Sequence, residues 1–465
     1  MSDEWTTSTI GALIAAAGGH IKTGPFGTTL KAKEYTKIGV PLISVGEIGY
    51  GKIQAHEKTP RVSPEVVNRL PEYVLRTGDI VFARKGAVDR SAMVSQEQDG
   101  WFLGSDGIRL RPPESIDSRF LAYQLQSDDS RRWIIQHATG TTMASLNQGV
   151  IDRIPIVVPP LHAQRSIASI LGSLDGKIEI DCSINRTLEA MAQAIFKSWF
   201  IDFDPVKAKI AAIEQGQDPL RAAMRVISGK TGTELDQMPR AHHDELAAIA
   251  ALFPDAMEES ELGEIPRGWS FRAADLLTEV GIGKTPPRKE PHWFTEGEGY
   301  LRWVSIKDMG ASGVFQQRSS EFLTSEAVSR FNVRVVPDRT VLLSFKLTIG
   351  RVSITDGPMV TNEAIAHFKL LEDSVISAEY LYLYLKGFDY SMLGSTSSIA
   401  DAVNSKTIRE MPILLANSDL IDCFTTSVTP IFEEVRNRQD EIAALGATRD
   451  TLLPKLLSGE IEVSE

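Results

Sequence analysis

Residues 154–200 read IPIVVPPLHAQRSIASILGSLDGKIEIDCSINRTLEAMAQAIFKSWF, and from Ile167 onward apolar side chains recur at alternating steps of three and four. This spacing is typical of the heptad seam of a long helix that packs lengthwise on another helix. A helix of about 35–40 residues is ~50–60 Å long at ~1.5 Å per residue, which is a spacer's length. The predicted seam residues of this helix include Leu171, Leu174, Ile178, Leu188, Ile195 and Trp199.

The end of the chain carries a second run with the same period. Adding 257 to each seam position from Leu171 to Trp199 gives a seam position of this second run, so the registers agree. Asp181 aligns with Arg438, and this polar level has two interpretations, a solvated face or a polar layer that fixes the register. Two prolines in the second run, at 430 and 454, are expected to shorten or kink its helix. Its predicted seam residues include Val428, Ile431, Val435, Leu445, Leu452 and Leu456.

The segments before the two helices also repeat. IVFARKGAVDR aligns with VLLSFKLTIGR at an offset of 261, so Lys85 and Arg90 are equivalent to Lys346 and Arg351. Short β-branched runs followed by one amphipathic helix predict a compact α+β domain in each copy. The acidic, alanine-rich segment 205–264 has no counterpart and is expected to be a connector with short helices. The predicted order is a domain at 1–158, a helix at 159–204, the connector, a domain at 265–415, and a helix with a tail at 416–465.

Composition and charge restrict the class of protein and its possible partners. The 465 residues are 42% hydrophobic and 24% charged, which is typical of a globular chain of two or three domains. The net charge of −12 speaks, taken whole, against a nucleic-acid binder. However, residues 1–160 hold 18 Lys and Arg against 17 Asp and Glu, and residues 265–416 hold 17 against 17. The acidity therefore lies outside the two domains, and a DNA partner is not excluded.

Targeting and redox signals are weak. The chain has no apolar run of the length of a membrane span, and its first residues, MSDEWTTSTI, carry acids where a signal peptide needs basic residues. We therefore expect a cytoplasmic protein without membrane insertion. Cys182 and Cys423 show no CxxC or Cys/His clustering and are expected to be reduced structural thiols.

Candidate catalytic motifs lack residues that their chemistry needs. Gly281–Thr285 resembles the end of a phosphate-binding loop, but the earlier glycine is missing and two prolines follow. Asp338 and Lys346 imitate a metal-dependent nuclease signature, but Ser344 stands where a second carboxylate would hold Mg²⁺. We therefore predict no catalytic residue, no metal and no cofactor in this chain.

Three loop families in each domain combine cations with hydroxyl and amide side chains, which bind phosphates and base edges. The first, second and third loops are 21–35, 84–90 and 138–149 in the first domain, and 283–293, 346–351 and 394–405 in the second. Two similar modules held apart by long helices suit a ligand that repeats in space, as duplex DNA does at each turn. Lys85 and Lys346 are the leading candidates for phosphate contacts. The predicted DNA-binding residues of the first domain are Lys22, Thr23, Thr28, Thr29, Lys31, Lys33, Arg84, Lys85, Arg90, Thr141, Thr142 and Asn147. Those of the second domain are Lys284, Thr285, Arg288, Lys289, Lys346, Arg351, Ser397 and Asn404.

Several strings resemble one known family over essentially the whole chain. They are GPFGTTLKAKEY with GVPLISVGEI, the run 154–200, GKTPPRKE with RWVSIKDM, and the terminal RDTLLPKLLSGEI. The PPL-x-x-Q and LLPKLLSGEI strings are the most specific of these. By these motifs the chain resembles the specificity (S) subunits of type I restriction-modification enzymes.

The resemblance implies an architecture and partners. Residues 1–158 and 265–415 would be two target recognition domains, each reading half of a split site in double-stranded DNA. The two long helices would form an antiparallel coiled coil that separates them, in a pseudo-twofold internal repeat. Two methyltransferase (modification) subunits and restriction/translocase subunits would bind this chain. S-adenosylmethionine, ATP and Mg²⁺ would act in those partners, which would methylate adenine and cut DNA.

One departure and two alternatives stand beside this resemblance. The second helix opens with LLANSDLID and lacks the PPL-x-x-Q entry, so its docking surface is not fully equivalent to that of the first. An enzyme would require a catalytic site that the motifs do not supply. A non-catalytic coiled-coil scaffold would use the same helices without discriminating DNA sequences.

Overall fold

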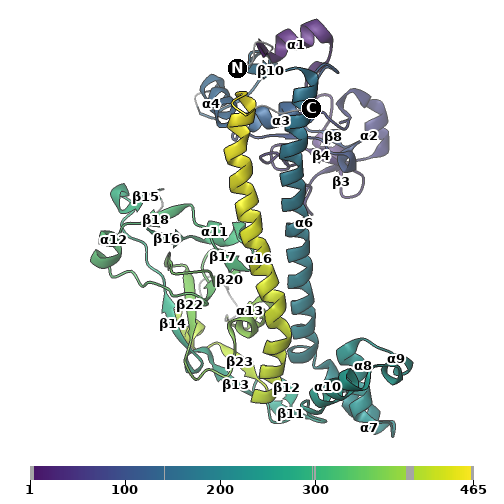
Figure 1. Ribbon diagram of the computed structural model, residues 1–465, viewed down its shortest axis with the longest axis vertical. Helices are drawn as coiled ribbons and strands as arrows, with labels where there is room; N and C mark the ends of the chain where they lie inside the picture. The colour runs from purple at the N-terminus through teal and green to yellow at the C-terminus, as the bar shows by residue number, and fades with distance from the viewer. Residues whose placement is uncertain (1–4, 141, 296, 298–299, 394–402, 462–465) are drawn as a thin grey trace. The chain divides into compact units, whose positions relative to one another are not determined.

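The computed structural model describes residues 5–140, 142–295, 297, 300–393 and 403–461 (Figure 1). The chain divides into two compact units, Met1–Glu179 with Ala443–Glu465 and Ile180–Ile442. Each unit contains mixed strands and helices and one segment of each of two long helices. This content agrees with the predicted α+β class.

The first unit is built on two four-stranded sheets in its described residues. One sheet has the order β2 (His20–Thr23), β9 (Gly107–Arg111), β6 (Ile80–Ala83) and β7 (Ser91–Met93). The other has the order β3 (Tyr35–Thr36), β5 (Arg61–Val62), β4 (Val40–Ile43) and β8 (Phe102–Leu103). β1 (Thr6–Thr9) pairs antiparallel with β10 (Pro155–Val158). The shorter helices are α1 (Ile10–Ala17), α2 (Pro64–Arg69), α3 (Ser118–Gln126), α4 (Asp128–His137) and α5 (Gln148–Asp152).

Strand β6 explains why this domain has two apolar clusters. All four of its residues are buried, and successive side chains of a strand point to opposite faces. Ile80 and Phe82 join the cluster that includes Leu121 of α3, whereas Val81 and Ala83 join the cluster around β4 and β8. The continuous apolar run IVFA is therefore a strand covered on both faces.

The second unit repeats this arrangement with additions. One sheet has the order β14 (Thr278–Ile282), β22 (Ile365–Leu370), β19 (Val341–Ser344), β20 (Val352–Thr355) and β17 (Phe315–Gln316). The other has the order β15 (Phe294–Thr295), β18 (Glu321–Leu323), β16 (Leu301–Val304) and β21 (Val360–Thr361). β13 (Ser270–Ala273) pairs antiparallel with β23 (Pro412–Leu415). The helices of the domain include α11 (Ile306–Ala311), α12 (Ser325–Arg330), α13 (Ala378–Gly387) and α15 (Ser405–Arg409).

The connector forms short helices and a hairpin. Its elements are α7 (Asp204–Glu214), α8 (Pro219–Ser228), α9 (Gly232–Asp236), α10 (Arg240–Ala251), and the paired strands β11 (Met257–Ser260) and β12 (Gly263–Pro266). Ala223, Met224 and Leu235 are buried in a small apolar cluster of these helices. Within the described part of the chain, no helix is both long and apolar enough to cross a membrane.

The predicted internal repeat is confirmed in the strand order of the sheets and in the long helices. The order β2-β9-β6-β7 of the first domain recurs as β14-β22-β19-β20 in the second. β6 begins at Ile80 and β19 at Val341, which are the two positions aligned in the sequence repeat. β10 and β23 begin at Pro155 and Pro412, which are also aligned positions. The two long helices, α6 (Leu161–Phe200) and α16 (Ser418–Leu457), each have 40 residues and begin at aligned positions as well.

The long helices contact each other within each unit. In the first unit, Ile167 and Leu171 of α6 share an apolar cluster with Leu456 of α16. In the second unit, Trp199 of α6 lies 5.8 Å from Phe424 of α16, ring centre to ring centre. The start of α6 therefore meets the end of α16, and the end of α6 meets the start of α16. The predicted seam residues of both helices are buried or half-buried: Leu171, Leu174, Ile178, Leu188, Ile195, Trp199, Val428, Ile431, Val435, Leu445, Leu452 and Leu456.

The polar level of the seam is an ion pair. Arg438 Nη1 donates to Asp181 Oδ1 at 2.7 Å, and the Asp181 residue is 0% exposed. Arg438 also pairs with Glu434 on its own helix, at 2.6 Å. The interpretation of this level as a solvated face is therefore wrong. The two side chains form a polar layer, and its role in fixing the register stays a prediction.

The expectation that Pro430 and Pro454 shorten the second helix is wrong, whereas a kink at either proline stays a prediction. Helix α16 runs without interruption through both and ends at Leu457. An interior proline costs about 3 kcal/mol, but Val428 and Phe432 beside Pro430 are almost fully buried. Burial of two such side chains contributes about 3–6 kcal/mol, which offsets the lost backbone hydrogen bond.

Candidate nucleic-acid interface

Arg84, in the second predicted loop of the first domain, contacts both the first and the third loop. Its guanidinium carbon lies 5.1 Å from the centre of the Phe26 ring, in the loop that follows β2. Its backbone oxygen accepts a hydrogen bond from Leu146 N at 2.7 Å, in the loop before α5. Gln148 Nε2 donates to Thr23 Oγ1 at 3.1 Å, which ties the first loop to the third. The fold therefore brings these three sequence-distant loops together.

The cations of this loop cluster differ in how freely they face solvent. Lys85 Nζ lies 3.0 Å from Asp106 Oδ1, and 46% of the Lys85 side chain is exposed. Lys22 on β2 lies over the Tyr73 ring, 5.1 Å from its centre. A half-exposed ion pair contributes little stability, so Lys85 is able to exchange Asp106 for a phosphate at small cost.

The remaining predicted residues of the first loop lie on a turn and a short 3-10 helix, Ala32–Glu34. Thr29 N donates to Phe26 O at 2.8 Å, and Lys31 N donates to Glu34 Oε2 at 2.9 Å, so backbone bonds shape this loop. The side chains of Thr28, Lys31 and Lys33 are exposed, as is that of Thr142 in the third loop. Thr141 lies outside the described residues.

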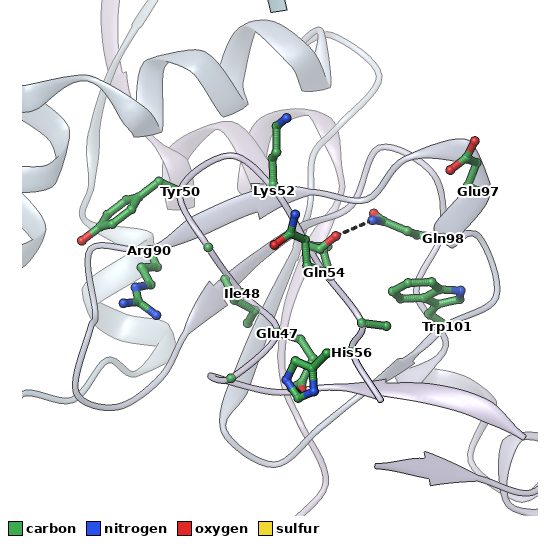
Figure 2. A pocket seen from close by; sticks show the side chains of 14 residues that line it. Glu47, Ile48, Tyr50, Lys52, Gln54, His56, Arg90, Glu97, Gln98 and Trp101 are labelled. Carbon is green, nitrogen blue, oxygen red and sulfur yellow. Dashed lines mark hydrogen bonds and ion pairs between the residues drawn. The ribbon is translucent and has the colours of Figure 1, made fainter. Parts of the chain in front are cut away.

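Arg90 lies beside a pocket that motif analysis did not anticipate. The pocket has a volume of about 710 Å³, and Tyr50, Gln54, His56 and Trp101 also line it (Figure 2). The Arg90 guanidinium lies 5.6 Å from the centre of the Tyr50 ring. Aromatic faces, an amide and cations offer both stacking and hydrogen bonding to nucleotides. The stretch GYGKIQAH, rich in polar residues after a buried strand, was the signal in the sequence.

Buried ionisable groups lie behind the first loop. Asp79 is 1% exposed, and Arg111 donates two hydrogen bonds of 2.7 Å to its carboxylate. Burial, and then the neighbouring Arg109, lower the pKa of His20 below its ordinary value. Arg109 is 2% exposed. These groups hold the sheet together, and Arg109 and Arg111 are already engaged by Asp79.

In the second domain, Arg288 is held by several partners at once. It donates two hydrogen bonds to the Glu321 carboxylate, at 2.6 and 2.9 Å. Its guanidinium lies 4.0 Å from the Phe294 ring centre and 4.4 Å from that of Trp303. This planar, two-sided arrangement suits arginine and fixes the loop on the β15–β18–β16 sheet. Its predicted DNA contact stays a prediction.

The other predicted residues of the Arg288 loop differ in whether their side chains face solvent or form hydrogen bonds. Lys284 and Lys289 have exposed side chains. Thr285 Oγ1 donates to Glu363, and Lys284 N donates to Thr361 O at 2.8 Å. Backbone and side-chain bonds therefore shape this loop, and its two lysines face solvent.

Lys346 and Arg351 have different surroundings although they lie in one loop. Lys346 is exposed, with Nζ 5.4 Å from the centre of the Phe345 ring. Arg351 is half-buried and donates through Nη1 to Ile306 O at 2.5 Å, which joins the β19–β20 hairpin to the start of α11. A side chain at Gly310 would collide with this guanidinium, because its Cβ would overlap the Arg351 Nη1 atom. Arg351 therefore positions the hairpin, and Lys346 remains available to a ligand.

Asn147 and Asn404 have equivalent structural roles. Asn147 Oδ1 accepts from Val150 N at 3.0 Å and caps the start of α5. Asn404, its counterpart in the repeat, accepts from Lys406 N at 2.9 Å and caps the start of α15. An asparagine before a short helix is a common N-cap, and this signal was present in the sequence. Ser397 lies outside the described residues.

Comparisons with known proteins agree on one family. Residues 2–190 match the model of the type I restriction modification DNA specificity domain. The chain is 30% identical over 406 residues to the type I restriction enzyme HindI specificity subunit of Haemophilus influenzae, covering 83% of this chain and 87% of that protein. It is 22% identical over 473 aligned positions to the MjaIX specificity subunit of Methanocaldococcus jannaschii, covering 99% and 94%.

A solved structure has the same fold. The S subunit of a type I restriction-modification system from M. genitalium superposes with a TM-score of 0.52 at 14% identity, covering 100% of this chain and 98% of that one. At this identity the match speaks for the fold, while the relative from H. influenzae covers enough of the chain to show the family. The chain belongs to the family of type I restriction enzyme specificity subunits.

Proposed function

We propose that this chain reads a bipartite sequence in double-stranded DNA and directs adenine methylation and restriction by partner subunits. Residues 1–158 and 265–415 act as the two target recognition domains, one for each half of the site. The observation that carries this proposal is the repeated sheet order with equivalent loops, in a chain of the specificity-subunit family. Two similar but non-identical readers fit a site with two different halves.

The helices α6 and α16 act as the spacer between the two readers. They have equal lengths of 40 residues, and a helix of this length is ~60 Å long at ~1.5 Å per residue. Their buried ion pair between Asp181 and Arg438 supports a fixed register, because sliding either helix would separate the two charges. The connector at 205–264 links the end of α6 to the second domain.

Affinity and discrimination are divided between different side chains. Lys85 and Lys346, exposed at equivalent positions, neutralise phosphates and set the position on the duplex. Hydroxyl and amide side chains of the loops, with Arg90 and the pocket beside it, read base edges. Neither domain carries a marked excess of positive charge, so DNA is gripped mainly by the assembled complex.

Catalysis belongs to the partners in this proposal. Two methyltransferase subunits bind along the helices, use S-adenosylmethionine and methylate adenine. Restriction/translocase subunits use ATP and Mg²⁺ to move and cut DNA. The PPL-x-x-Q entry of the first helix lacks an equivalent in the second, so the two docking surfaces differ in detail.

Selection from a random duplex library tests this function. The chain is purified with its methyltransferase partner, and bound duplexes are recovered and sequenced. We expect a split motif with a constant gap. Recovery of unenriched duplexes would favour the alternative, a coiled-coil scaffold that does not discriminate DNA sequences.

An exchange of one domain shows which half of the DNA site each domain reads. Replacing residues 1–158 by the equivalent domain of a relative should change one half of the selected motif and leave the other. A change in both halves would contradict independent reading by the two domains.

A further inference from the structure

The loop between β19 and β20 presents an apolar side chain to solvent. Leu347 is 94% exposed, whereas Leu342 and Leu343 of β19 are 0% exposed. The φ angle of Leu347 is 62°, a left-handed conformation that residues other than glycine rarely adopt. Leu347 therefore combines backbone strain with an apolar surface left in water, and both are unfavourable for the isolated chain.

The first domain has glycine at the equivalent position. Gly86 aligns with Leu347 at the offset of 261, and its φ angle is 72°. A Cβ built on Gly86 meets no heavy atom within 4 Å, so space does not exclude a side chain there. Glycine adopts this conformation without strain. The fold alone would favour glycine in both loops, and stability of the domain does not explain Leu347.

Bonds at the base of the loop impose this conformation. Ser344 is 0% exposed, and its Oγ donates to Thr348 O at 2.6 Å and accepts from Arg351 N at 3.0 Å. Thr348 N donates to Lys346 O at 2.7 Å, which closes a tight turn around Leu347. The loop is anchored in a buried strand and holds Leu347 outward. Binding therefore costs little conformational entropy at this residue.

The neighbours of Leu347 suit a nucleic acid. Lys346 beside it is exposed, and the equivalent loop of the first domain carries Lys85. An apolar side chain next to a phosphate-binding cation is the arrangement by which DNA-binding proteins contact a thymine methyl group or enter between stacked bases. Lys346 and Thr348, the chain neighbours of Leu347, are polar and exposed, which favours a nucleic acid over an apolar protein surface as the partner of this loop.

We infer that Leu347 makes an apolar contact with the bases of the half-site read by residues 265–415, while Lys346 holds the adjacent phosphate. This inference rests on the proposed function, since it requires that the second domain faces DNA. Gly86 leaves the first domain without such a contact. The two half-sites are therefore read by different chemistry at equivalent loops.

The test uses the complex of the full chain with its methyltransferase partner and the duplex selected by it. Leu347→Gly installs the residue of the first domain and should leave the unfolding temperature unchanged or raised. We expect it to weaken binding of the selected duplex about tenfold and to leave binding of unrelated duplexes unchanged. Leu347→Met keeps an apolar side chain and should bind within about twofold of the parent. Leu276→Ala, at another exposed leucine of the same domain (62%), is the matched control and should change nothing.

Modified duplexes distinguish the two forms of apolar contact. Replacing thymine by uracil in the second half-site removes the C5 methyl group. If Leu347 contacts that methyl group, this change weakens the parent but not the Leu347→Gly variant. If Leu347 enters between bases, 2-aminopurine in that half-site brightens on binding the parent and not the variant. Either result supports the inference.

Three outcomes overturn it. Equal affinity of the parent and Leu347→Gly for the selected duplex would show that the side chain does not contact DNA. Loss of the methyltransferase partner from Leu347→Gly would make Leu347 a protein contact instead. A parent complex without sequence discrimination would overturn the proposed function, and this inference with it, before any variant is compared.

Discussion

Asp181 and Arg438 are counterparts in the internal repeat, and they bind each other. The positions of this ion pair differ by 257, which is the offset that relates α6 to α16. Asp181 lies at the middle of α6, and Arg438 has the same place in α16. The two antiparallel helices therefore contact each other midpoint to midpoint.

Loss of this pair should destabilise the chain. Asp181→Leu removes the buried partner of Arg438, which keeps its ion pair with Glu434. We expect this change to lower the free energy of unfolding by about 2 kcal/mol. Arg449→Ala is the control, because Arg449 pairs with Asp175 at 2.7 Å where both side chains are about one-third exposed. Its cost should be at most about 1 kcal/mol.

Denaturant unfolding of the purified chain measures both effects. The double variant Asp181→Leu with Arg438→Leu should recover most of the lost stability, because it removes both charges together. Equal midpoints for Asp181→Leu and the parent would contradict a stabilising role for the pair.

The spacer proposal predicts the gap between the half-sites. Adding one heptad to each long helix beside the Asp181–Arg438 pair keeps the seam in phase and lengthens the helices by about 10 Å. The selected motif should then gain about three base pairs between unchanged halves. Adding four residues instead should disturb the seam and reduce folding. An unchanged gap in the heptad variant would exclude the helices as the spacer.

The two lysines predicted to bind phosphates should affect the salt dependence of binding. Each of Lys85→Ala and Lys346→Ala should reduce the slope of log K against log salt by about 0.9, because one fewer counterion is released. Lys230→Ala changes an exposed lysine of the connector and should leave the slope unchanged. A slope that stays constant in the Lys85 and Lys346 variants would remove these residues from the interface.

Acid should destabilise the second domain through His367. The His367 side chain is buried beside Thr361, and burial together with the nearby Arg334 lowers the pKa of His367 to about 3. The unfolded chain binds this proton near pH 6.5, so stability is full above that pH and falls as the pH drops toward 3. At pH 5 the loss should approach about 2 kcal/mol.

Thermal unfolding between pH 7.5 and pH 5 measures this loss. His367→Gln keeps a polar group beside Thr361 but does not titrate, so its unfolding temperature should fall less with acid. Because other groups also titrate, the comparison is the difference between the two pH profiles. Parallel profiles would contradict a role for His367.

The helices were predictable because their signal is local and repeated. The seam positions from Leu171 to Trp199 recur at one offset, and each is buried or half-buried. The burial of Asp181 was harder to predict, since a polar seam residue is stable there only when the opposite helix supplies a cation at that level. The expected shortening at the prolines is wrong because the local backbone cost of a proline does not include the packing of Val428 and Phe432, which keeps α16 continuous.

The contacts of the loop side chains were less predictable, because many of their partners lie far away in the sequence. Arg288 looks like a free cation in GKTPPRKE, but Phe294, Trp303 and Glu321 reach it from three strands. The pocket beside Arg90 also joins segments far apart in the sequence. Residue types identified the loops, whereas their partners depended on strand pairing that no local pattern encodes.

The ion pair between Asp181 of the first repeat and Arg438 of the second also affects which repeats can pair with each other. Two copies of the first repeat, paired in the same way, would place Asp181 against another Asp181, and two copies of the second would place Arg438 against Arg438. Like charges in a buried seam repel, so neither homodimer is as favourable as the mixed pair. A single charge reversal thus makes each half prefer the other over itself, and the fused chain keeps two different readers together.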